Sequence, residues 1–235
     1  MSRSIRVLAS AIAFLILLQP PWASRSCLHI GCHYDGPMSE EERLPDPILG
    51  DRFSEAAAYA IELHARQARK GTTIPYVTHL FAVSSLALED GADEDAAIAG
   101  LLHDAAEDQG GKATLDEIGR RFGPVVEMLV DGLTDTLEDP KPAWRPRKDA
   151  YLKRLAGEPE SVLRVSIADK LHNIRSIAID VANNGEEAWD RFNAGHDGQA
   201  WLHRSLLAIF EKSFAGSRNL PEYRRLVLEV FGPER

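Results

Sequence analysis

The chain has 235 residues, of which 44% are hydrophobic and 27% are charged, and its formal net charge at pH 7 is -9. This length allows one well-buried domain, and the composition is that of an ordinary globular protein. The acidic balance argues against nucleic acid as a partner, because binding a phosphate backbone needs a concentrated basic face. A small anionic substrate stays possible, since a bound cation and a few basic side chains can reverse the local potential.

The beginning of the chain has the pattern of a signal peptide. Arg3 and Arg6 precede an apolar run from Val7 to Leu18. This run is shorter than the roughly 20 residues that a helix needs to cross a bilayer. We therefore expect no stable membrane span here. If the signal peptide is genuine, the protein is periplasmic or exported.

A start of translation at Met38 is the interpretation that we favour. Residues 1–37 are then a mis-assigned extension, 38–50 a flexible leader and 51–235 the folded domain. Both cysteines lie before Gly36, so no disulfide or thiolate zinc site can support the core. This cysteine usage suits a reducing compartment, and the expected location is the cytoplasm.

The chain after residue 50 predicts helices separated by recognisable stops, with no convincing strand alternation and no internal repeat. Ser54, Thr78 and Thr114 are expected to cap helices, and Pro124 to open one. We therefore predict an all-α, single-domain helical bundle, with a long loop over Asp135–Arg147. The expected helices are Ser54–Lys70, His79–Glu89, Glu94–Asp108, one from Thr114 to Gly123, one opening at Pro124, Lys148–Ala156, Pro159–Val181, Glu186–Phe192, Gly198–Phe214 and Pro221–Val230.

An apolar stretch ends abruptly in His103, Asp104, Glu107 and Asp108. Four residues advance a helix by about one turn, so His103 and Glu107 share one stripe, and the two aspartates share the next. A neighbouring His–Asp pair offers one imidazole nitrogen and one carboxylate oxygen to the same ion. Divalent metals such as Mn²⁺, Fe²⁺ or Zn²⁺ accept that mixture of ligands.

Two further residues complete a possible ligand set. His79 lies at an expected helix start, and Asp169 interrupts an apolar helix face, where an unpaired carboxylate is costly unless a cation binds it. Each residue alone has an ordinary structural explanation, and only the set in this order points to a metal. The remaining histidines considered are interpreted as structural or surface residues: His64, His172, His196 and His203.

The set resembles the HD superfamily of metal phosphohydrolases, whose pattern is H…HD…D. Within it, the chain resembles the hydrolase domain of the bifunctional (p)ppGpp synthetase/hydrolases and their small stand-alone relatives. The resemblance covers roughly residues 52–180, with Leu80 in place of the proline that often follows the first histidine. Four segments carry it: Ala68–His79, Leu101–Asp108, Thr114–Thr134 and Ile167–Arg175.

This resemblance implies removal of the 3′-diphosphate from guanosine 3′,5′-bis(diphosphate), with Mn²⁺ as cofactor, although another divalent metal is possible. A guanine nucleotide is then the small-molecule partner, and the oligomeric state is not predicted. The implied site residues are the metal ligands His79, His103, Asp104 and Asp169, the catalytic pair Glu107 and Asp108, and the substrate-binding residues Arg69, Lys70, Thr78 and Asn173.

Several alternatives stay open at this point. The chain could be an HD phosphohydrolase for another nucleotide or phosphorylated cofactor, or a non-catalytic nucleotide sensor. Arg69 and Lys70 could simply complement the dipole at a helix C-terminus. The basic residues that could gather the distal diphosphate are Lys141, Arg145, Arg147, Lys148, Arg191 and Arg204.

Overall fold

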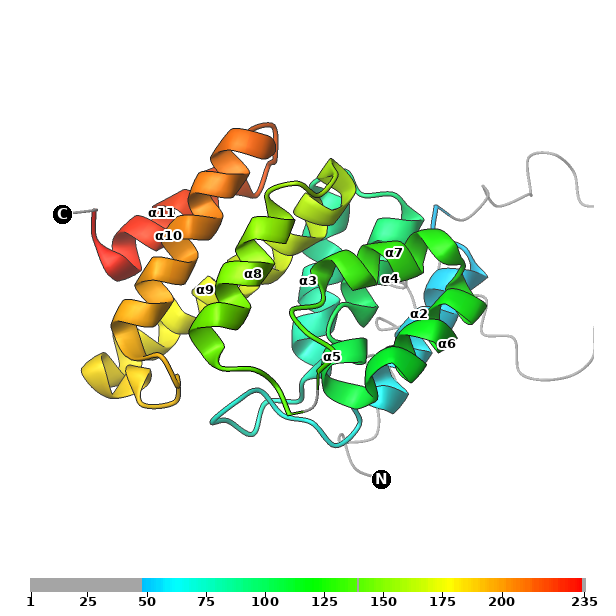
Figure 1. The fold of residues 1–235 in the computed structure, drawn as a ribbon, viewed down its shortest axis with the longest axis horizontal. Helices are drawn as coiled ribbons and strands as arrows, with labels where there is room; N and C mark the ends of the chain where they lie inside the picture. The colour runs from blue at the N-terminus through cyan, green and yellow to red at the C-terminus, as the bar shows by residue number, and fades with distance from the viewer. Residues whose placement is uncertain (1–47, 139, 234–235) are drawn as a thin grey trace, which may run out of the picture. The chain divides into compact units, whose positions relative to one another are not determined.

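Helices dominate the part of the chain that the computed structural model describes, residues 48–138 and 140–233 (Figure 1). No strand occurs in those residues, where an antiparallel bridge joins Ala68 and Pro75. The predicted all-α class is confirmed, whereas the interpretations of 1–37 and of most of 38–50 fall outside the described residues. The helices are α2 (Asp51–Leu63), α3 (Val77–Glu89), α4 (Glu94–Leu102), α5 (Ala105–Gln109), α6 (Gly111–Phe122), α7 (Pro124–Leu133), α8 (Trp144–Leu155), α9 (Glu160–Asn184), the 3-10 helix η3 (Gly185–Trp189), α10 (Gly195–Ser213) and α11 (Leu220–Phe231).

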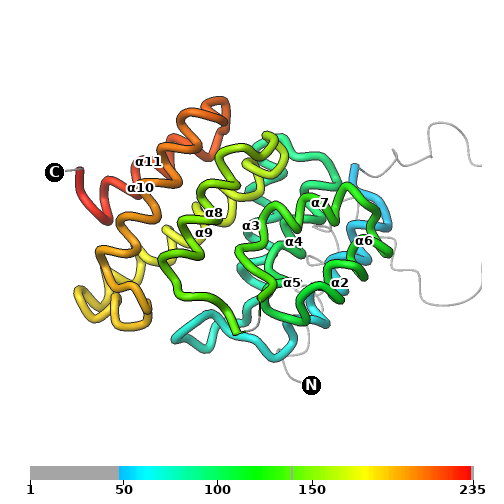
Figure 2. Tube along the Cα trace, viewed as in Figure 1, coloured from blue at the N-terminus to red at the C-terminus, as the bar shows by residue number. Residues whose placement is uncertain are grey.

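The long helix α9 is the central element of this bundle. It contacts α3, α4 and α7 as well as α10, α11 and η3. Figures 1 and 2 show α10 and α11 on one side of α8 and α9, and α2 to α7 on the other. Each fully buried aliphatic side chain stabilises such a core by about 1.5–3 kcal/mol. The buried apolar residues of α9 are Val162, Leu163, Val165, Ile167, Ala168, Leu171, Ile174 and Ile177.

The first predicted helix ends earlier than expected. α2 stops at Leu63, and the chain then turns back on itself, with the Arg69 N–H donating to Ile74 O at 2.8 Å. Gly71 has a φ of +74°, a conformation that glycine adopts without steric cost, so it makes a loop turn instead of ending a helix. Arg69 and Lys70 therefore lie on a loop. This position removes the helix dipole as an explanation for the basic pair.

The predicted helix caps are wrong at three positions. Ser54, Thr78 and Thr114 lie inside their helices, because α2, α3 and α6 begin three, one and three residues earlier. Thr78 Oγ1 donates to Pro75 O at 2.8 Å, a local bond that competes with capping and that the sequence pattern does not distinguish from it. Pro124 does open α7, as predicted.

The helix predicted over Glu94–Asp108 is interrupted at the proposed metal pair. His103 and Asp104 occupy the break between α4 and α5. The His103 ring donates through Nδ1 to Gly100 O at 2.9 Å, so the side chain uses a carbonyl that a continuous helix gives to a backbone N–H. This bond fixes the ring with Nε2 near the carboxylates of Asp104 and Asp169.

The later boundaries differ from prediction by smaller amounts. The loop predicted over Asp135–Arg147 is shorter, because α8 already begins at Trp144 with Pro146 in its first turn, where a missing N–H costs little. The helix expected over Glu186–Phe192 is the short η3. Among the described residues, no helix combines the length and the apolar character needed to cross a membrane.

We expect Asp90→Ala to lower the free energy of unfolding by about 1–3 kcal/mol, because it leaves buried donors without their acceptor. Asp90 is buried at the end of α3, where it accepts hydrogen bonds from Ser217 Oγ at 2.7 Å and from the Arg218 N–H. Urea denaturation of the full-length chain measures the change. Asp116→Ala, which removes an exposed partner of Lys112, is the control and should stay within about 0.5 kcal/mol. Equal effects of the two substitutions would contradict the structural role of Asp90.

Candidate functional site

The four side chains predicted to bind a metal converge where α3, α9 and the break between α4 and α5 meet. His79 Nε2 lies 3.3 Å from Asp169 Oδ1 and 3.7 Å from Asp104 Oδ2. His103 Nε2 lies 3.0 Å from Asp104 Oδ2 and 3.8 Å from Asp169 Oδ1. Ligands held about 2.0–2.2 Å from one divalent ion are roughly 3–4.4 Å from each other. The ligand atoms of His79, His103 and Asp169 are thus close enough to one another for a single ion, whereas Asp104 lies beside the two imidazoles and stays a predicted fourth ligand.

The electrostatics of this cluster favour a cation. Burial opposes ionisation of Asp169, but Lys170 and the two imidazoles hold the pKa of its carboxyl well below the usual range. Burial also opposes the charged form of His103, yet the Asp104 carboxylate outweighs it and raises the pKa of the ring to about 9. The carboxylates thus attract positive charge to the same imidazole nitrogen that faces the cluster.

The residues present fit a divalent metal ion. His103 Nε2 is buried and makes no hydrogen bond within the described part of the chain, although Asp104 lies close to it. Ligand atoms of His79, His103 and Asp169 all lie within 4.8 Å of one another. Two imidazole nitrogens with carboxylate oxygens form a donor set that suits Mn²⁺, Fe²⁺ or Zn²⁺. The cluster is therefore a possible metal site.

Neighbouring groups fix the orientation of every predicted ligand. Such partners set the tautomer of a metal-binding histidine and the direction of a carboxylate. Only His103 is held by a backbone group, the Gly100 carbonyl. The side-chain contacts are His79 Nδ1 to His172 Nδ1 at 2.8 Å, Tyr76 Oη to Asp104 Oδ2 at 2.5 Å, Asn173 Nδ2 to Asp169 Oδ1 at 2.5 Å and Lys170 Nζ to Asp169 Oδ2 at 2.6 Å.

The predicted catalytic carboxylates lie beside the cluster. Glu107 and Asp108 line a cavity of about 220 Å³ together with Asp104 and Asp169, two of the predicted metal ligands. Lys141 Nζ lies 2.9 Å from Glu107 Oε1 and 3.5 Å from Asp108 Oδ1. Both carboxylates can therefore reach groups in the cavity while a nearby ammonium balances their charge.

A second cavity has a volume of about 450 Å³. This volume falls within the range of about 300–1,000 Å³ that is typical of small-molecule sites. The predicted substrate-binding residues Arg69, Lys70, Thr78 and Asn173 all line it. Arg69 Nη2 donates to Asn173 Oδ1 at 2.6 Å, so the loop after α2 is tied to α9 across this cavity. Its other lining residues include the apolar Ile74, Ile177, Ile179 and Phe192 and the basic Lys148, Lys170 and Arg191.

The two cavities share part of their lining. Tyr76, Lys148, Lys170 and Asn173 border both. Three of these residues also donate hydrogen bonds to predicted metal ligands. Tyr76 donates to Asp104, and Lys170 and Asn173 both donate to Asp169. A ligand that extends from one cavity into the other would pass directly beside the metal cluster.

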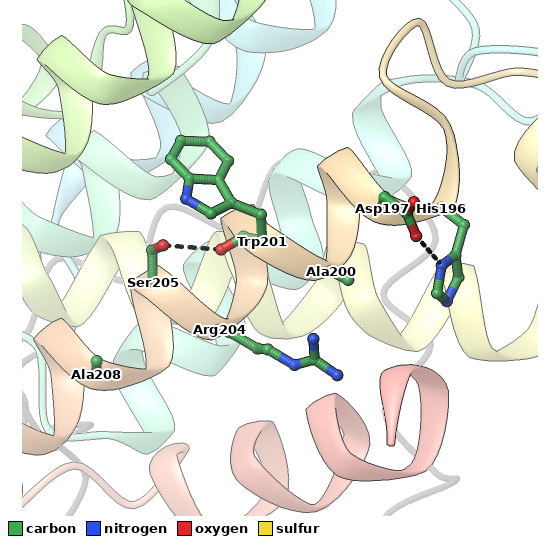
Figure 3. Close-up of a pocket in the computed structure, with 7 residues that line it drawn as sticks. All are labelled: His196, Asp197, Ala200, Trp201, Arg204, Ser205 and Ala208. Carbon is green, nitrogen blue, oxygen red and sulfur yellow. Dashed lines mark hydrogen bonds and ion pairs between the residues drawn. The ribbon is translucent and has the colours of Figure 1, made fainter. Parts of the chain in front are cut away.

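A cavity of about 490 Å³ along α10 is not part of this site (Figure 3). Arg204, which the sequence left open as a diphosphate-binding residue, lies there and donates to the carbonyl oxygens of Phe231 and Gly232. It therefore caps the C-terminus of α11. His196 lies at the other end of the same cavity with its Nδ1 3.0 Å from Asp197 Oδ1 (Figure 3).

Two residues of the site were not identified from the sequence. His172 was interpreted as a structural or surface residue, yet its ring contacts the ring of His79 and lines the 450 Å³ cavity. Its position three residues after Asp169 on one helix face was the available signal. Tyr76 lies inside Ala68–His79, one of the segments that carry the family resemblance, but nothing in that segment shows that its hydroxyl reaches Asp104.

Comparison with known proteins identifies related chains. The family model described as HD domain matches residues 56–199. A GTP pyrophosphokinase of Streptomyces antibioticus is 37% identical over 147 residues, which are 60% of this chain and 17% of that protein. The chain therefore spans about a sixth of the length of this curated relative.

Two solved structures share the fold. One is a metazoan ortholog of SpoT that is described as hydrolysing ppGpp, with a TM-score of 0.62, 24% identity and coverage of 77% of this chain and 95% of that one. The other is lmo0812 of Listeria monocytogenes EGD-e, with a TM-score of 0.59, 28% identity and coverage of 66% of this chain and 99% of that one.

We expect Mn²⁺ to stabilise the protein after treatment with EDTA and buffer exchange. At about 100 times its Kd, a ligand that binds only the native state adds about 2.7 kcal/mol, or roughly 5–10 °C in Tm for a chain of this size. Differential scanning fluorimetry measures the shift. His103→Ala should lose it, whereas His196→Ala, which removes a distant histidine, should keep it. An undiminished shift in His103→Ala would refute the assignment of the cluster.

Proposed function

This chain belongs to the HD domain family, and on that premise we propose that it is a metal-dependent phosphohydrolase that removes the 3′-diphosphate from guanosine 3′,5′-bis(diphosphate) or its pentaphosphate relative. The observation that carries the proposal is the pair of cavities that meet beside the His79–His103–Asp104–Asp169 cluster. The larger one has apolar and basic walls suited to a nucleotide. The smaller one is mostly polar and suited to a diphosphate.

The related proteins support the same substrate class. The metazoan relative is described as hydrolysing ppGpp. The Streptomyces relative is named for a kinase reaction, but the matched segment is only 17% of its length. We therefore infer hydrolysis from the HD motif and the cluster, and not from the name of that longer protein. Because the proposed substrate is an intracellular nucleotide, the proposal includes a cytoplasmic location.

We assign the base and ribose of the substrate to the larger cavity. The guanidinium of Arg69 can stack on a purine, and Lys70 can act as a point charge for phosphate. Asn173, which bonds both Arg69 and the Asp169 carboxylate, would contact the ribose near the metal cluster. Lys148 and Lys170 border both cavities and would contact the 3′-diphosphate as it passes between them.

The proposed reaction breaks the bond between the ribose 3′ oxygen and phosphorus. A water molecule attacks that phosphorus, and the products are GDP and pyrophosphate. A divalent ion, which we propose to be Mn²⁺, would supply Lewis acidity by lowering the pKa of water and neutralising phosphate charge. Glu107 and Asp108, which line the smaller cavity, would orient the water, take its proton and deliver a proton to the 3′ oxygen as that oxygen leaves.

The full-length chain loaded with Mn²⁺ should convert guanosine 3′,5′-bis(diphosphate) to GDP and pyrophosphate. Ion-exchange chromatography separates the substrate from both products. EDTA treatment and His103→Ala should each abolish turnover, and Arg69→Ala should raise KM. Folded, metal-loaded protein without turnover would refute this substrate, and a panel of other nucleotides and phosphorylated cofactors would then test the wider HD phosphohydrolase assignment.

We expect Glu107→Gln to lower kcat by about 10²–10⁴-fold, because a neutral amide cannot take a proton from water. Its affinity for Mn²⁺ should change little, since Glu107 is not among the proposed ligands. Steady-state kinetics and metal titration measure the two effects. Glu117→Gln makes the same chemical change at the surface of α6, where Glu117 pairs with Arg120 and Arg121, and should leave kcat unaltered. Unchanged turnover in Glu107→Gln would favour another carboxylate as the base.

A further inference from the structure

The two histidines of the cluster are held in different ways. A histidine that binds a metal through Nε2 carries its hydrogen on Nδ1, and the partner of that N–H fixes the ring. For His103 the partner is the Gly100 carbonyl, a backbone group that can only accept. For His79 the partner is Nδ1 of another imidazole, His172, at 2.8 Å. The second arrangement works only if His172 has the matching tautomer.

The geometry determines which tautomer that is. His79 is buried, and its Nε2 faces the Asp169 and Asp104 carboxylates, so Nε2 is the nitrogen available to a metal. The His79 hydrogen must then be on Nδ1 and must be donated to His172. His172 Nδ1 therefore accepts, and the hydrogen of a neutral His172 ring must be on its Nε2.

His172 is also placed to do more than fill space. It is on α9, three residues after the predicted ligand Asp169, and its ring lies at a tilt of 41° to that of His79, with centroids 4.9 Å apart. Its side chain lines the 450 Å³ cavity that we assign to the nucleotide. The other ligand partners in that lining bond to carboxylates, which can accept from several donors at once. His79, by contrast, has only Nδ1 left to be held by a neighbour once Nε2 is assigned to the metal, and its partner there is His172.

We propose that His172 is a positioning residue, whose Nδ1 accepts the hydrogen bond that holds His79 in its metal-binding tautomer and orientation. The proposal rests on the metal site of the proposed function, but it does not depend on the identity of the substrate. It assigns to His172 an effect on metal affinity that requires an acceptor atom at the Nδ1 position, and not merely a ring of similar size.

Titration of the metal-free, full-length protein with Mn²⁺, followed by electron paramagnetic resonance of the free ion, tests this proposal without any substrate. His172→Ala should raise the Kd for Mn²⁺ by about 10–100-fold, the usual effect of losing such a partner. His172→Asn, whose side-chain oxygen can occupy the Nδ1 position, should recover most of the affinity. His172→Phe, which keeps the ring and lacks the acceptor, should not, and His196→Ala should bind as the unmodified chain does.

The pattern of the variants separates positioning from packing. Circular dichroism of each metal-free variant first confirms that it is folded. The proposal would be overturned if His172→Phe recovered the affinity for Mn²⁺ and His172→Asn did not. An unchanged Kd for Mn²⁺ in His172→Ala would overturn it too. Loss of metal affinity in Ala and Phe with recovery in Asn would support it even if guanosine 3′,5′-bis(diphosphate) is not hydrolysed, so failure of the proposed substrate is a separate result.

Discussion

The carboxylate of Asp169, buried on the central helix α9, is the constraint around which the described domain is organised. An ionised carboxylate taken out of water costs several kcal/mol unless charges and hydrogen bonds compensate it. Lys170, Asn173 and the ring of His79 surround this one and supply that compensation. Because these groups come from α3 as well as α9, satisfying one buried charge also fixes how the two helices meet.

The residues that contact the predicted metal ligands also connect the proposed metal site to the proposed nucleotide cavity. Asn173 and Lys170 at Asp169, Tyr76 at Asp104 and His172 at His79 all belong to the wall of the 450 Å³ cavity. A nucleotide in that cavity would contact the residues that orient the predicted metal ligands, but not the predicted metal ligands themselves. Only His103, held by the backbone of α4, is independent of the cavity.

Much of this arrangement could be predicted from the sequence. Helical periodicity gives the all-α class, and the H…HD…D order gives four residues that the structure brings together, whose binding of metal stays a prediction. The interruption at His103 could not be predicted, because it depends on a side-chain bond to a carbonyl in the preceding turn. Likewise, the loop position of Arg69 depends on backbone pairing with Ile74, and the role of His172 depends on the approach of a second helix. Local sequence patterns predict the secondary structure and chemistry of a residue, whereas these features depend on contacts with other parts of the folded chain.

The spacing of the ligands along the chain has a consequence for folding. His79 and Asp169 are ninety residues apart, and the His103–Asp104 pair lies between them. Contacts of such long sequence separation form only after the entropy of closing the intervening loops has been overcome. A nascent chain that ends before α9 carries three of the four side chains but has no carboxylate from Asp169 to complete the set. The four predicted ligands are thus assembled late in folding, and an ion bound at the proposed site would require α3 and α9 to be together already.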